Sequence, residues 1–229
     1  GGNGDYNVIV LAPNSVQEMA DFVDLAFELA FKYRNPVMIL SDGVIGQMME
    51  KVVLPPFKPR RTEEEVRKEC PWATMGRTKD REPNILTSLE LKPEVMELRN
   101  IHLQEKYQTI RDNEVRYEAQ QCDDADYIIV SFGSAARIGE KAVELARAEG
   151  IKVGLFRPIT LWPFPSKEIA AAAKGKKGIL VSEINAGQMI QDVKLAVNGA
   201  LPVEHFGRLG GIVPDPEEIV NVLKDKLMR

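Results

Sequence analysis

The 229-residue sequence predicts an α/β protein in two parts, each built on a mainly parallel sheet. Short apolar runs alternate with longer amphipathic segments, a pattern typical of strands covered on both faces by helices. A proline-rich, charged stretch separates two such regions. We therefore assign residues 1–54 to the first part, residues 55–122 to a linker with a long helix, and residues 123–229 to a doubly wound second part.

The first part is predicted to be a strand–helix–strand unit. Residues 8–11 and 37–40 are continuous apolar runs, as in buried parallel strands. Between them, Ser15 and Glu18 have the spacing of a capping box that starts a helix, and Pro36 ends it. The apolar stripe of this helix is so wide that it must be covered on two sides.

Such a small unit cannot bury its own apolar faces. The sequence also begins without methionine, inside the glycine-rich stretch 1–5. We expect strands ahead of Gly1, or a partner chain, to supply the missing cover, so that the chain is part of a longer subunit.

The stretch 53–91 carries five prolines among many charges, so we expect it to be a linker that wraps over a neighbouring domain or subunit. Pro93 then opens a helix that is predicted to continue to about Gln121. Most of this helix is charged. It is either a solvated strut or a brace between domains or subunits.

The second part shows a regular alternation. We predict strands at 127–132, 153–156, 178–184 and 202–206, helices at 136–149, 188–198 and 216–228, a stiff loop at 157–165 and a short helix from Ser166. Asp215 and Pro216 are typical of a helix start. These lengths predict a doubly wound, mainly parallel sheet.

Composition excludes several function classes. The net charge of −4 gives no electrostatic footprint for nucleic acid, and no apolar run approaches the length that spans a bilayer. Cys70 and Cys122 are solitary, so they are expected to be reduced thiols. They are too few for an iron–sulfur cluster or a cysteine-type zinc site.

Few motifs indicate a catalytic or anion-binding site. The stretch 1–5 precedes a strand, whereas phosphate-binding loops follow one. Gly133 and Ser134 do follow a strand, so they either hold an anion or make a tight turn. Asp42 and Gly43 resemble the start of a diphosphate–magnesium motif without its asparagine, and are interpreted as a turn.

The two histidines are weak candidates for acid–base chemistry. His102 lies on the long charged helix and is expected to be solvated, and His205 is expected to be a core histidine bonded to a backbone carbonyl. The residues alone therefore indicate no self-contained active site.

Longer stretches resemble a known family. VLAPNSVQEMADFVDLAFELAFKYRNPVMILSDG is similar to the end of the pyrimidine-binding domain of transketolase-like thiamine diphosphate enzymes. DYIIVSFGSAARIGEKAVELARAEGIKVGLFRPITLWPFP, with SEINAGQM and VPDPEEI, resembles the transketolase C-terminal domain. With GGNGDY, RNPVMILSDGVIGQMME and EKYQTIRDNEVRYE, the chain resembles the α-type subunit of 2-oxoacid:ferredoxin oxidoreductases, most closely the 2-oxoisovalerate branch, and also the 2-oxoglutarate enzymes.

The resemblance implies a fold and a reaction. The chain would hold the remnant of a pyrimidine-binding domain followed by a transketolase C-terminal-like domain. The complex would convert a 2-oxoacid and coenzyme A to acyl-CoA and carbon dioxide while reducing ferredoxin. The glutamate that activates thiamine diphosphate precedes GGNGDY in the family, so no catalytic residue is expected here, and the isolated chain should be inactive.

The resemblance also implies partners and cofactor contacts. Magnesium and the diphosphate would be shared with a thiamine diphosphate-binding β subunit, and iron–sulfur clusters would lie only on partners, which include γ and ferredoxin-like δ subunits of a cytoplasmic complex. Asn3, Asp5, Asp42 and Gly43 are expected to contact or support the cofactor. Alternatives are a 2-oxoglutarate enzyme, a lipoyl- and NAD-linked dehydrogenase of the same superfamily, or a non-catalytic docking module.

Overall fold

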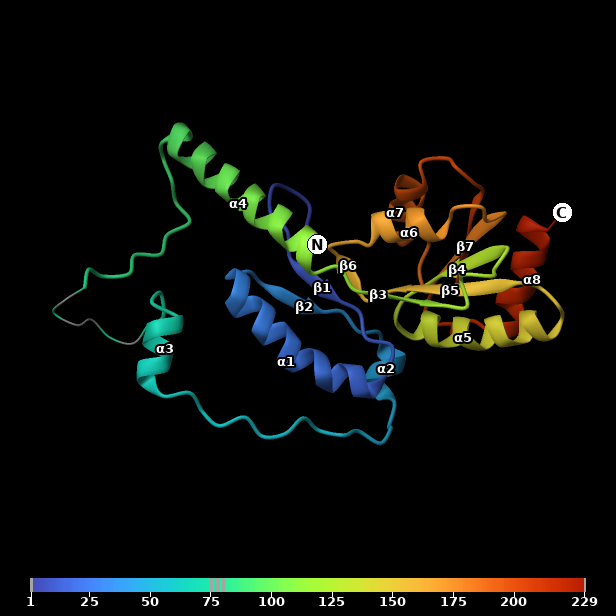
Figure 1. The fold of residues 1–229 in the computed structure, drawn as a ribbon, viewed down its shortest axis with the longest axis horizontal. Helices are drawn as coiled ribbons and strands as arrows, with labels where there is room; N and C mark the ends of the chain where they lie inside the picture. The colour runs from blue at the N-terminus through green and yellow to red at the C-terminus, as the bar shows by residue number, and fades with distance from the viewer. Residues whose placement is uncertain (1, 75, 77–78, 80, 229) are drawn as a thin grey trace.

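The computed structural model describes residues 2–74, 76, 79 and 81–228, so Gly1 of the glycine-rich stretch lies outside the described residues. The chain forms a three-stranded sheet and a five-stranded sheet, joined side by side (Figure 1). A long arm, residues 48–92, leaves the first sheet and returns to it through a helix (Figure 1). Among the described helices, none has the length and hydropathy needed to cross a membrane.

The first sheet contains the predicted strand–helix–strand unit. β1 (Ile9–Leu11) and β2 (Val37–Ile39) pair in parallel and are connected by α1 (Val16–Tyr33). Ser15 caps α1 by accepting a hydrogen bond from the backbone N–H of Glu18 at 3.2 Å, as predicted. The Glu18 carboxylate accepts from the N–H of Asn14 instead of closing the box on Ser15. Arg34, with a φ of 47°, ends the helix.

The third strand of this sheet comes from the second half of the sequence. β6 (Thr160–Trp162) lies in the segment predicted to be a loop, and it pairs antiparallel with β1. That prediction is wrong for residues 160–162, because β1 offers a second edge whose N–H and C=O groups need partners. The strand order is β2-β1-β6, and no strand in the described part of the chain pairs with the outer edge of β2.

The apolar stripe of α1 is only partly covered. Phe22 and Leu29 are buried, whereas Val23 and Phe27 are 46% and 64% exposed. The expectation that this helix needs cover on two sides agrees with these exposures: the described part of the chain provides cover on one side.

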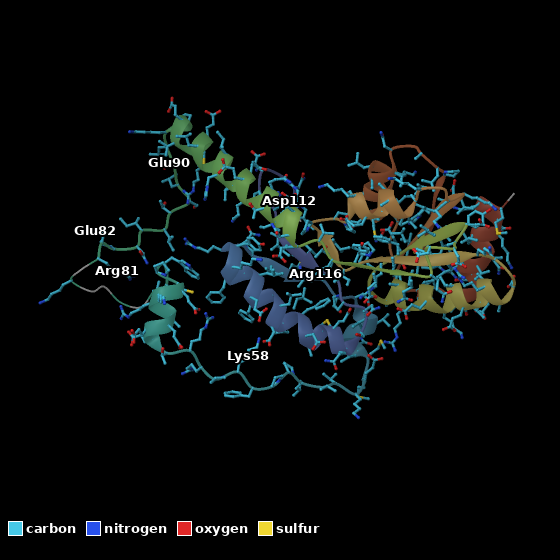
Figure 2. All side chains as sticks on the ribbon, viewed as in Figure 1. Lys58, Arg81, Glu82, Glu90, Asp112 and Arg116 are labelled. Atoms are coloured by element: carbon cyan, nitrogen blue, oxygen red, sulfur yellow. The ribbon has the colours of Figure 1, made fainter. Side chains whose placement is uncertain are left out.

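The arm begins after α2 (Gly43–Gln47) and contains α3 (Glu63–Glu69), which Thr62 caps with a capping box. Asp42 is the N-cap of α2, so the predicted turn at Asp42 and Gly43 is the start of a short helix. Apart from α3, the described residues of the arm form no regular element, as its prolines predict. In Figure 2, the labelled residues Arg81, Glu82 and Glu90 lie on the part of the arm that is far from the second sheet, whereas Lys58 pairs with Asp24 and Glu28 of α1.

The long helix α4 (Pro93–Asn113) ends earlier than predicted. The sequence pattern predicts a helix to about Gln121, but residues 117–120 form β3 (Tyr117–Gln120), which pairs antiparallel with β5 (Val153–Pro158). The edge of β5 offers backbone partners, and the Tyr117 ring stacks on Phe156 with centroids 5.0 Å apart. Only the end of α4 is packed: Tyr107 and Ile110 are buried against α1 and β1.

The second sheet confirms the doubly wound prediction. Its strand order is β3-β5-β4-β7-β8, and every pair except β3 with β5 is parallel. The remaining elements are β4 (Tyr127–Val130), α5 (Gly133–Ala148), α6 (Ser166–Ala172), β7 (Gly178–Glu183), α7 (Met189–Val197), β8 (Val203–Gly207) and α8 (Pro216–Leu227).

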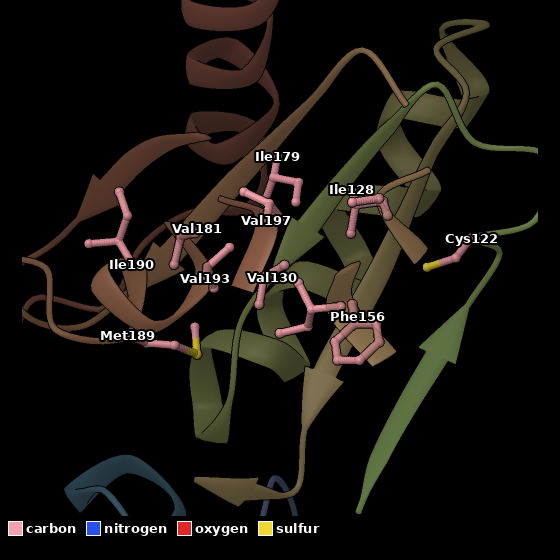
Figure 3. Packing of buried hydrophobic residues seen from close by; sticks show 12 residues of the cluster. Cys122, Ile128, Val130, Phe156, Ile179, Val181, Met189, Ile190, Val193 and Val197 are labelled. Carbon is pink, nitrogen blue, oxygen red and sulfur yellow. The ribbon is translucent and has the colours of Figure 1, made fainter. Parts of the chain in front are cut away.

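Side chains alternate between two cores on the faces of this sheet. Ile128 and Val130 point toward α6 and α7, where they meet Val193 and Met189 (Figure 3). Tyr127 and Ile129 point to the other face and pack with residues of α5 and α8.

Cys122 lies in the first core and Cys70 is buried at the end of α3. Both are free thiols, as predicted.

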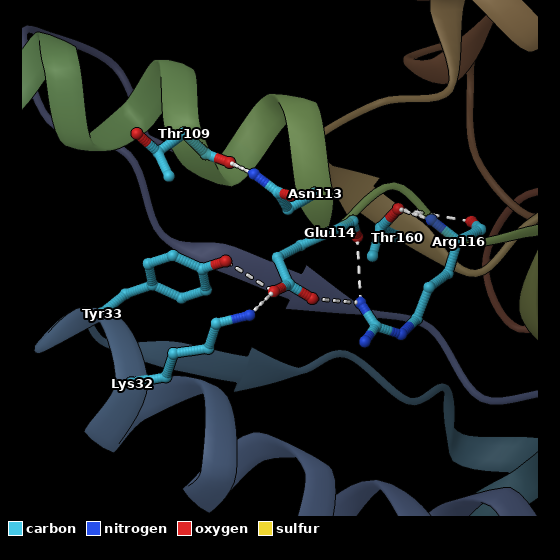
Figure 4. A network of polar contacts seen from close by, with 7 residues as sticks. All are labelled: Lys32, Tyr33, Thr109, Asn113, Glu114, Arg116 and Thr160. Carbon is cyan, nitrogen blue, oxygen red and sulfur yellow. Dashed lines mark hydrogen bonds and ion pairs between the residues drawn. The ribbon is translucent and has the colours of Figure 1, made fainter.

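A buried carboxylate joins the end of α4 to α1 and to the second sheet. Glu114, whose side chain is 4% exposed, accepts from Tyr33 Oη at 2.6 Å and Lys32 Nζ at 2.7 Å through one oxygen, and from Arg116 at 2.8 Å through the other (Figure 4). The backbone N–H of Arg116 donates to Thr160 Oγ1 at 2.9 Å. This network fixes the point where the chain passes from α4 into the second sheet.

Candidate functional site

A groove with a volume of about 380 Å³ lies between the two sheets. Val8, Val10, Met38 and Leu40 form one wall, because alternate residues of neighbouring strands share a face. The opposite wall includes Phe164, which follows β6, and residues at the ends of β4 and β7 and at the start of α7: Phe132, Glu183, Asn185, Gln188 and Met189. The groove is therefore mainly apolar, with polar groups at one side.

Asp42 joins the two sheets at the edge of this groove. Its Oδ1 accepts from the N–H groups of Val44 and Ile45, both at 3.0 Å, which starts α2. Its Oδ2 accepts from the N–H of Ser134 at 2.9 Å, in the first turn of α5. The anion predicted as one possibility for Gly133 and Ser134 is thus supplied by a side chain of the same protein.

Glu183 occupies the start of α7 in a similar way. Its buried carboxylate accepts from the N–H groups of Gln188, Met189 and Ile190 at 3.2, 2.8 and 3.1 Å. Nε2 of His205 lies 3.7 Å from Glu183 Oε1, so His205 faces a carboxylate, whereas a backbone carbonyl was predicted. Both helix starts that border the groove therefore carry carboxylates of the chain itself, and an external phosphate would compete with them.

Arg157 provides the third connection between the sheets. Its side chain is 1% exposed and forms a bidentate pair with Glu18 of α1, at 2.8 and 2.7 Å. It also contacts Glu118 of β3 at 3.0 Å. Nearby, Arg137 of α5 pairs with Glu50 at 2.6 Å. A bidentate pair of this kind sets orientation as well as distance, so Arg157 fixes how the sheets face each other.

The structure does not bring the four predicted site residues together. Asn3 and Asp5 are exposed and precede β1, whereas Asp42 and Gly43 follow β2, at the opposite end of the parallel pair. Their neighbours do reach the groove: Gly2 and Tyr6 line it. Asp42 lines an adjoining cavity of about 190 Å³. The cofactor roles of Asn3, Asp5, Asp42 and Gly43 stay predictions.

The donor set of this site does not fit a magnesium–diphosphate group. Both oxygens of Asp42 are already engaged by three backbone N–H groups. In the described ranges, no three His, Cys, Asp or Glu side chains are grouped as metal ligands would be. Burial raises the pKa of the Cys122 thiol to about 11, so this thiol stays protonated at neutral pH and is a poor ligand.

Gly133 is required by the contact between α5 and Asp42. Its φ is +60°, and a Cβ at this position would lie 3.0 Å from Asp42 Oδ2. We expect Gly133→Ala to lower the free energy of unfolding by about 1–2 kcal/mol in urea titrations. Gly150→Ala is the matched control, because Gly150 has a φ of +83° and open space around its Cβ position. Equal losses in the two variants would show that the contact with Asp42 adds nothing.

The half-buried carboxylate of Asp42 and the buried carboxylate of Glu114 make stability depend on pH. Burial alone would raise the pKa of Asp42, but the N–H donors of Ile45, Ser134 and Val44 outweigh it and hold the pKa below its ordinary value. Burial alone would also raise the pKa of Glu114, but hydrogen bonds from Lys32, Tyr33 and Arg116 outweigh it and hold this pKa below its ordinary value. A folded-state pKa below the unfolded value stabilises the protein above the unfolded pKa, and this stability is lost as pH falls through the folded pKa.

We therefore expect the urea midpoint to fall as the pH is lowered from about 6 to about 3. The double variant Asp42→Asn, Glu114→Gln should be less stable at neutral pH and show a flatter pH profile. A profile of the same steepness in the double variant would contradict this assignment.

Comparison with solved structures shows which known folds the chain shares. The fold matches a 2-oxoglutarate:ferredoxin oxidoreductase from Magnetococcus marinus, described as having 2-oxoglutarate, coenzyme A and succinyl-CoA bound, with a TM-score of 0.71 over 99% of this chain and 43% of that one, at 24% identity. It also matches a split-gene transketolase, described as an inactive beta4 tetramer, with a TM-score of 0.54 at 14% identity, over 97% of this chain and 58% of that one. The chain thus has a transketolase-like fold.

Sequence comparison gives the family. Residues 3–119 match the model described as pyruvate flavodoxin/ferredoxin oxidoreductase, thiamine diphosphate-binding, and residues 125–219 match pyruvate:ferredoxin oxidoreductase core domain II. The chain belongs to this family of 2-oxoacid:ferredoxin oxidoreductases.

Two relatives from Methanothermobacter marburgensis are similar along the whole chain. Ketoisovalerate oxidoreductase subunit VorB is 45% identical over 98% of this chain, and 2-oxoglutarate synthase subunit KorA is 35% identical over 96%. The chain spans 62% and 64% of the length of these relatives. The matching subunit is called B in the ketoisovalerate enzyme and A in the 2-oxoglutarate enzyme. The predicted α-type label therefore agrees with the naming of the second enzyme and differs from that of the first.

Proposed function

We propose that the chain acts within a subunit of a thiamine diphosphate-dependent 2-oxoisovalerate:ferredoxin oxidoreductase, which forms a branched-chain acyl-CoA and reduces ferredoxin. The observation that carries the proposal is the identity of 45% to the ketoisovalerate subunit over nearly the whole chain, against 35% for the 2-oxoglutarate subunit. The 2-oxoglutarate enzyme is the second candidate. The geometry is consistent with a supporting role, because the Glu183 carboxylate that lines the groove is held by three backbone N–H groups at the start of α7.

The role of this chain is to build one side of a shared site. Bound thiamine diphosphate would supply the carbanion chemistry that 2-oxoacid decarboxylation needs. The magnesium–diphosphate end and the iron–sulfur clusters belong to partner subunits, of β, γ and ferredoxin-like δ type, in a cytoplasmic complex that uses coenzyme A. Asn3 and Asp5 would support the cofactor from one end of the β1–β2 pair and Asp42 and Gly43 from the other, and the catalytic residues lie outside this chain.

The test is substrate preference in the complete complex. The purified complex is assayed for viologen reduction with 2-oxoisovalerate, 2-oxoglutarate and pyruvate, each with and without coenzyme A. We expect kcat/KM for 2-oxoisovalerate to exceed that for 2-oxoglutarate by about tenfold or more. A preference for 2-oxoglutarate would favour the second candidate, and reduction of NAD in place of viologen would contradict both.

A further inference from the structure

Lys106, next to the packed end of α4, has surroundings that set it apart from other lysines. Most lysines in the described part of the chain are exposed, and three are half-buried: Lys106, Lys176 and Lys224. The Lys224 ammonium pairs with Glu149, and the Lys176 ammonium donates to two backbone carbonyls, at 2.6 and 3.2 Å. Of the three, Lys106 has the weakest partner, because its Nζ donates to the carbonyl oxygen of Arg34 at 3.4 Å.

The position of Lys106 disfavours a charged ammonium. The side chain is half-buried, and in the ranges that the structure describes it forms no ion pair with a carboxylate. Its Nζ lies 5.3 Å from the centroid of the Tyr107 ring, which favours the charged form, but less than a carboxylate would. Burial, and then the positive charge of Arg34, hold the pKa of Lys106 below its ordinary value. A larger share of this amine is therefore neutral at a given pH than of an ordinary lysine.

The neighbouring cation, Arg34, is held by packing. It ends α1 in the left-handed conformation, and its guanidinium lies 4.8 Å from the centroid of the Trp72 ring in the arm. The Trp72 ring in turn lies 5.7 Å from the Phe31 ring, centroid to centroid. No carboxylate of the described residues pairs with Arg34, so its charge acts on Lys106 without a counterion. An amine that is desolvated beside another cation is the usual form of a nucleophilic lysine.

We propose that Lys106 is an acyl-acceptor site that reacts with thioesters of the acyl-CoA class. The lone pair of the neutral Nζ attacks the thioester carbonyl carbon, and the carbon–sulfur bond breaks, with its electron pair leaving on sulfur. Nζ then loses a proton, which neutralises the thiolate, so the products are an N-acyl-lysine and the free thiol of coenzyme A. The positive charge of Lys106 is lost, and with it the repulsion from Arg34.

Only the source of the thioester rests on the proposed function, because acyl-CoA is the product of that reaction. The first test therefore supplies the thioester directly. Isobutyryl-CoA is added to the purified complex without a 2-oxoacid, and acylation of each lysine is followed over time by mass spectrometry. We expect Lys106 to react about threefold or more faster than Lys194, an exposed lysine of α7, and to reach its half-maximal rate at a lower pH. A rate for Lys106 equal to or below that of Lys194 would overturn the proposal.

The variant His102→Glu tests whether the state of the amine sets this rate. It places a carboxylate one helical turn before Lys106, where the two side chains can pair and keep the ammonium charged. Acylation of Lys106 should slow by about threefold, while that of Lys194 stays unchanged. The side chain of His102 is 80% exposed, and His102→Gln is the matched control without the charge. Circular dichroism verifies folding, and an unchanged Lys106 rate in His102→Glu would contradict the proposal.

A further arm of the experiment separates this site from the proposed function. The added thioester is replaced by 2-oxoisovalerate, coenzyme A and oxidised viologen, and we expect the isobutyryl group to accumulate on Lys106 as viologen is reduced. Acylation of Lys106 by added thioester but not under these conditions would support the acceptor site and contradict the proposed reaction. Absence of acylation in both arms would overturn the acceptor site, whether or not viologen is reduced.

Discussion

Replacing Arg157 with methionine is expected to lower the free energy of unfolding by about 3–5 kcal/mol, because it leaves the Glu18 carboxylate half-buried without its cation. The Arg157 side chain is 1% exposed and holds Glu18 of α1 and Glu118 of β3 together. A loss of this size would lower the melting temperature by roughly 10 °C. Thermal and urea unfolding of the variant measure it.

The double variant Glu18→Gln, Arg157→Met separates the loss of the pair from the presence of an unpaired charge. It should recover part of the stability lost in Arg157→Met, because neither partner is then left charged and buried. Arg99→Met, at an exposed site on α4, is the control and should change stability by no more than about 0.5 kcal/mol. A small effect of Arg157→Met, similar to that of the control, would show that this pair does not hold the sheets together.

Glu114→Ala is expected to cost about 3 kcal/mol, the second largest effect. Its carboxylate is 4% exposed and accepts from Lys32, Tyr33 and Arg116, so the substitution leaves a buried Tyr33 hydroxyl and a partly buried guanidinium without their acceptor. The urea midpoint and the m-value report the loss. Glu97→Ala, at an exposed position of the same helix, is the control.

The Glu114 prediction has a second readout, since this carboxylate joins α4 to the second sheet. Hydrogen exchange should increase at the end of α4 and in β3, with little change in the core of β4 and β7. Uniform exchange changes across the protein, or none near α4, would contradict the view that Glu114 acts at the junction.

Most of the regular elements were predictable because their signals are local. The Ser15 cap, the apolar runs that became β1 and β2, and the Asp215–Pro216 start of α8 depend on a few consecutive residues. The doubly wound, mainly parallel character of the second sheet followed from alternating strands and helices, whereas its strand order was not predicted. The resemblance was needed for the family, because no compact motif in the chain defines its chemistry.

The errors came from contacts between residues distant in sequence. Residues 160–162 become a strand only because β1 has an edge free in space, and residues 117–120 leave the helix only because β5 offers its edge. Asp42 looked like part of a turn or a cofactor motif, yet its distinctive contact is with Ser134, which no local pattern indicates. Arg157 was assigned to a loop for the same reason: its partners Glu18 and Glu118 lie far away in sequence.

The most direct test of the proposed role is reconstitution of the complex with and without this chain. Acyl-CoA and reduced viologen are measured together after addition of 2-oxoisovalerate and coenzyme A. We expect stoichiometric formation of both products when the chain is present and loss of both when it is omitted. Undiminished formation of both products by a complex that lacks the chain would contradict it.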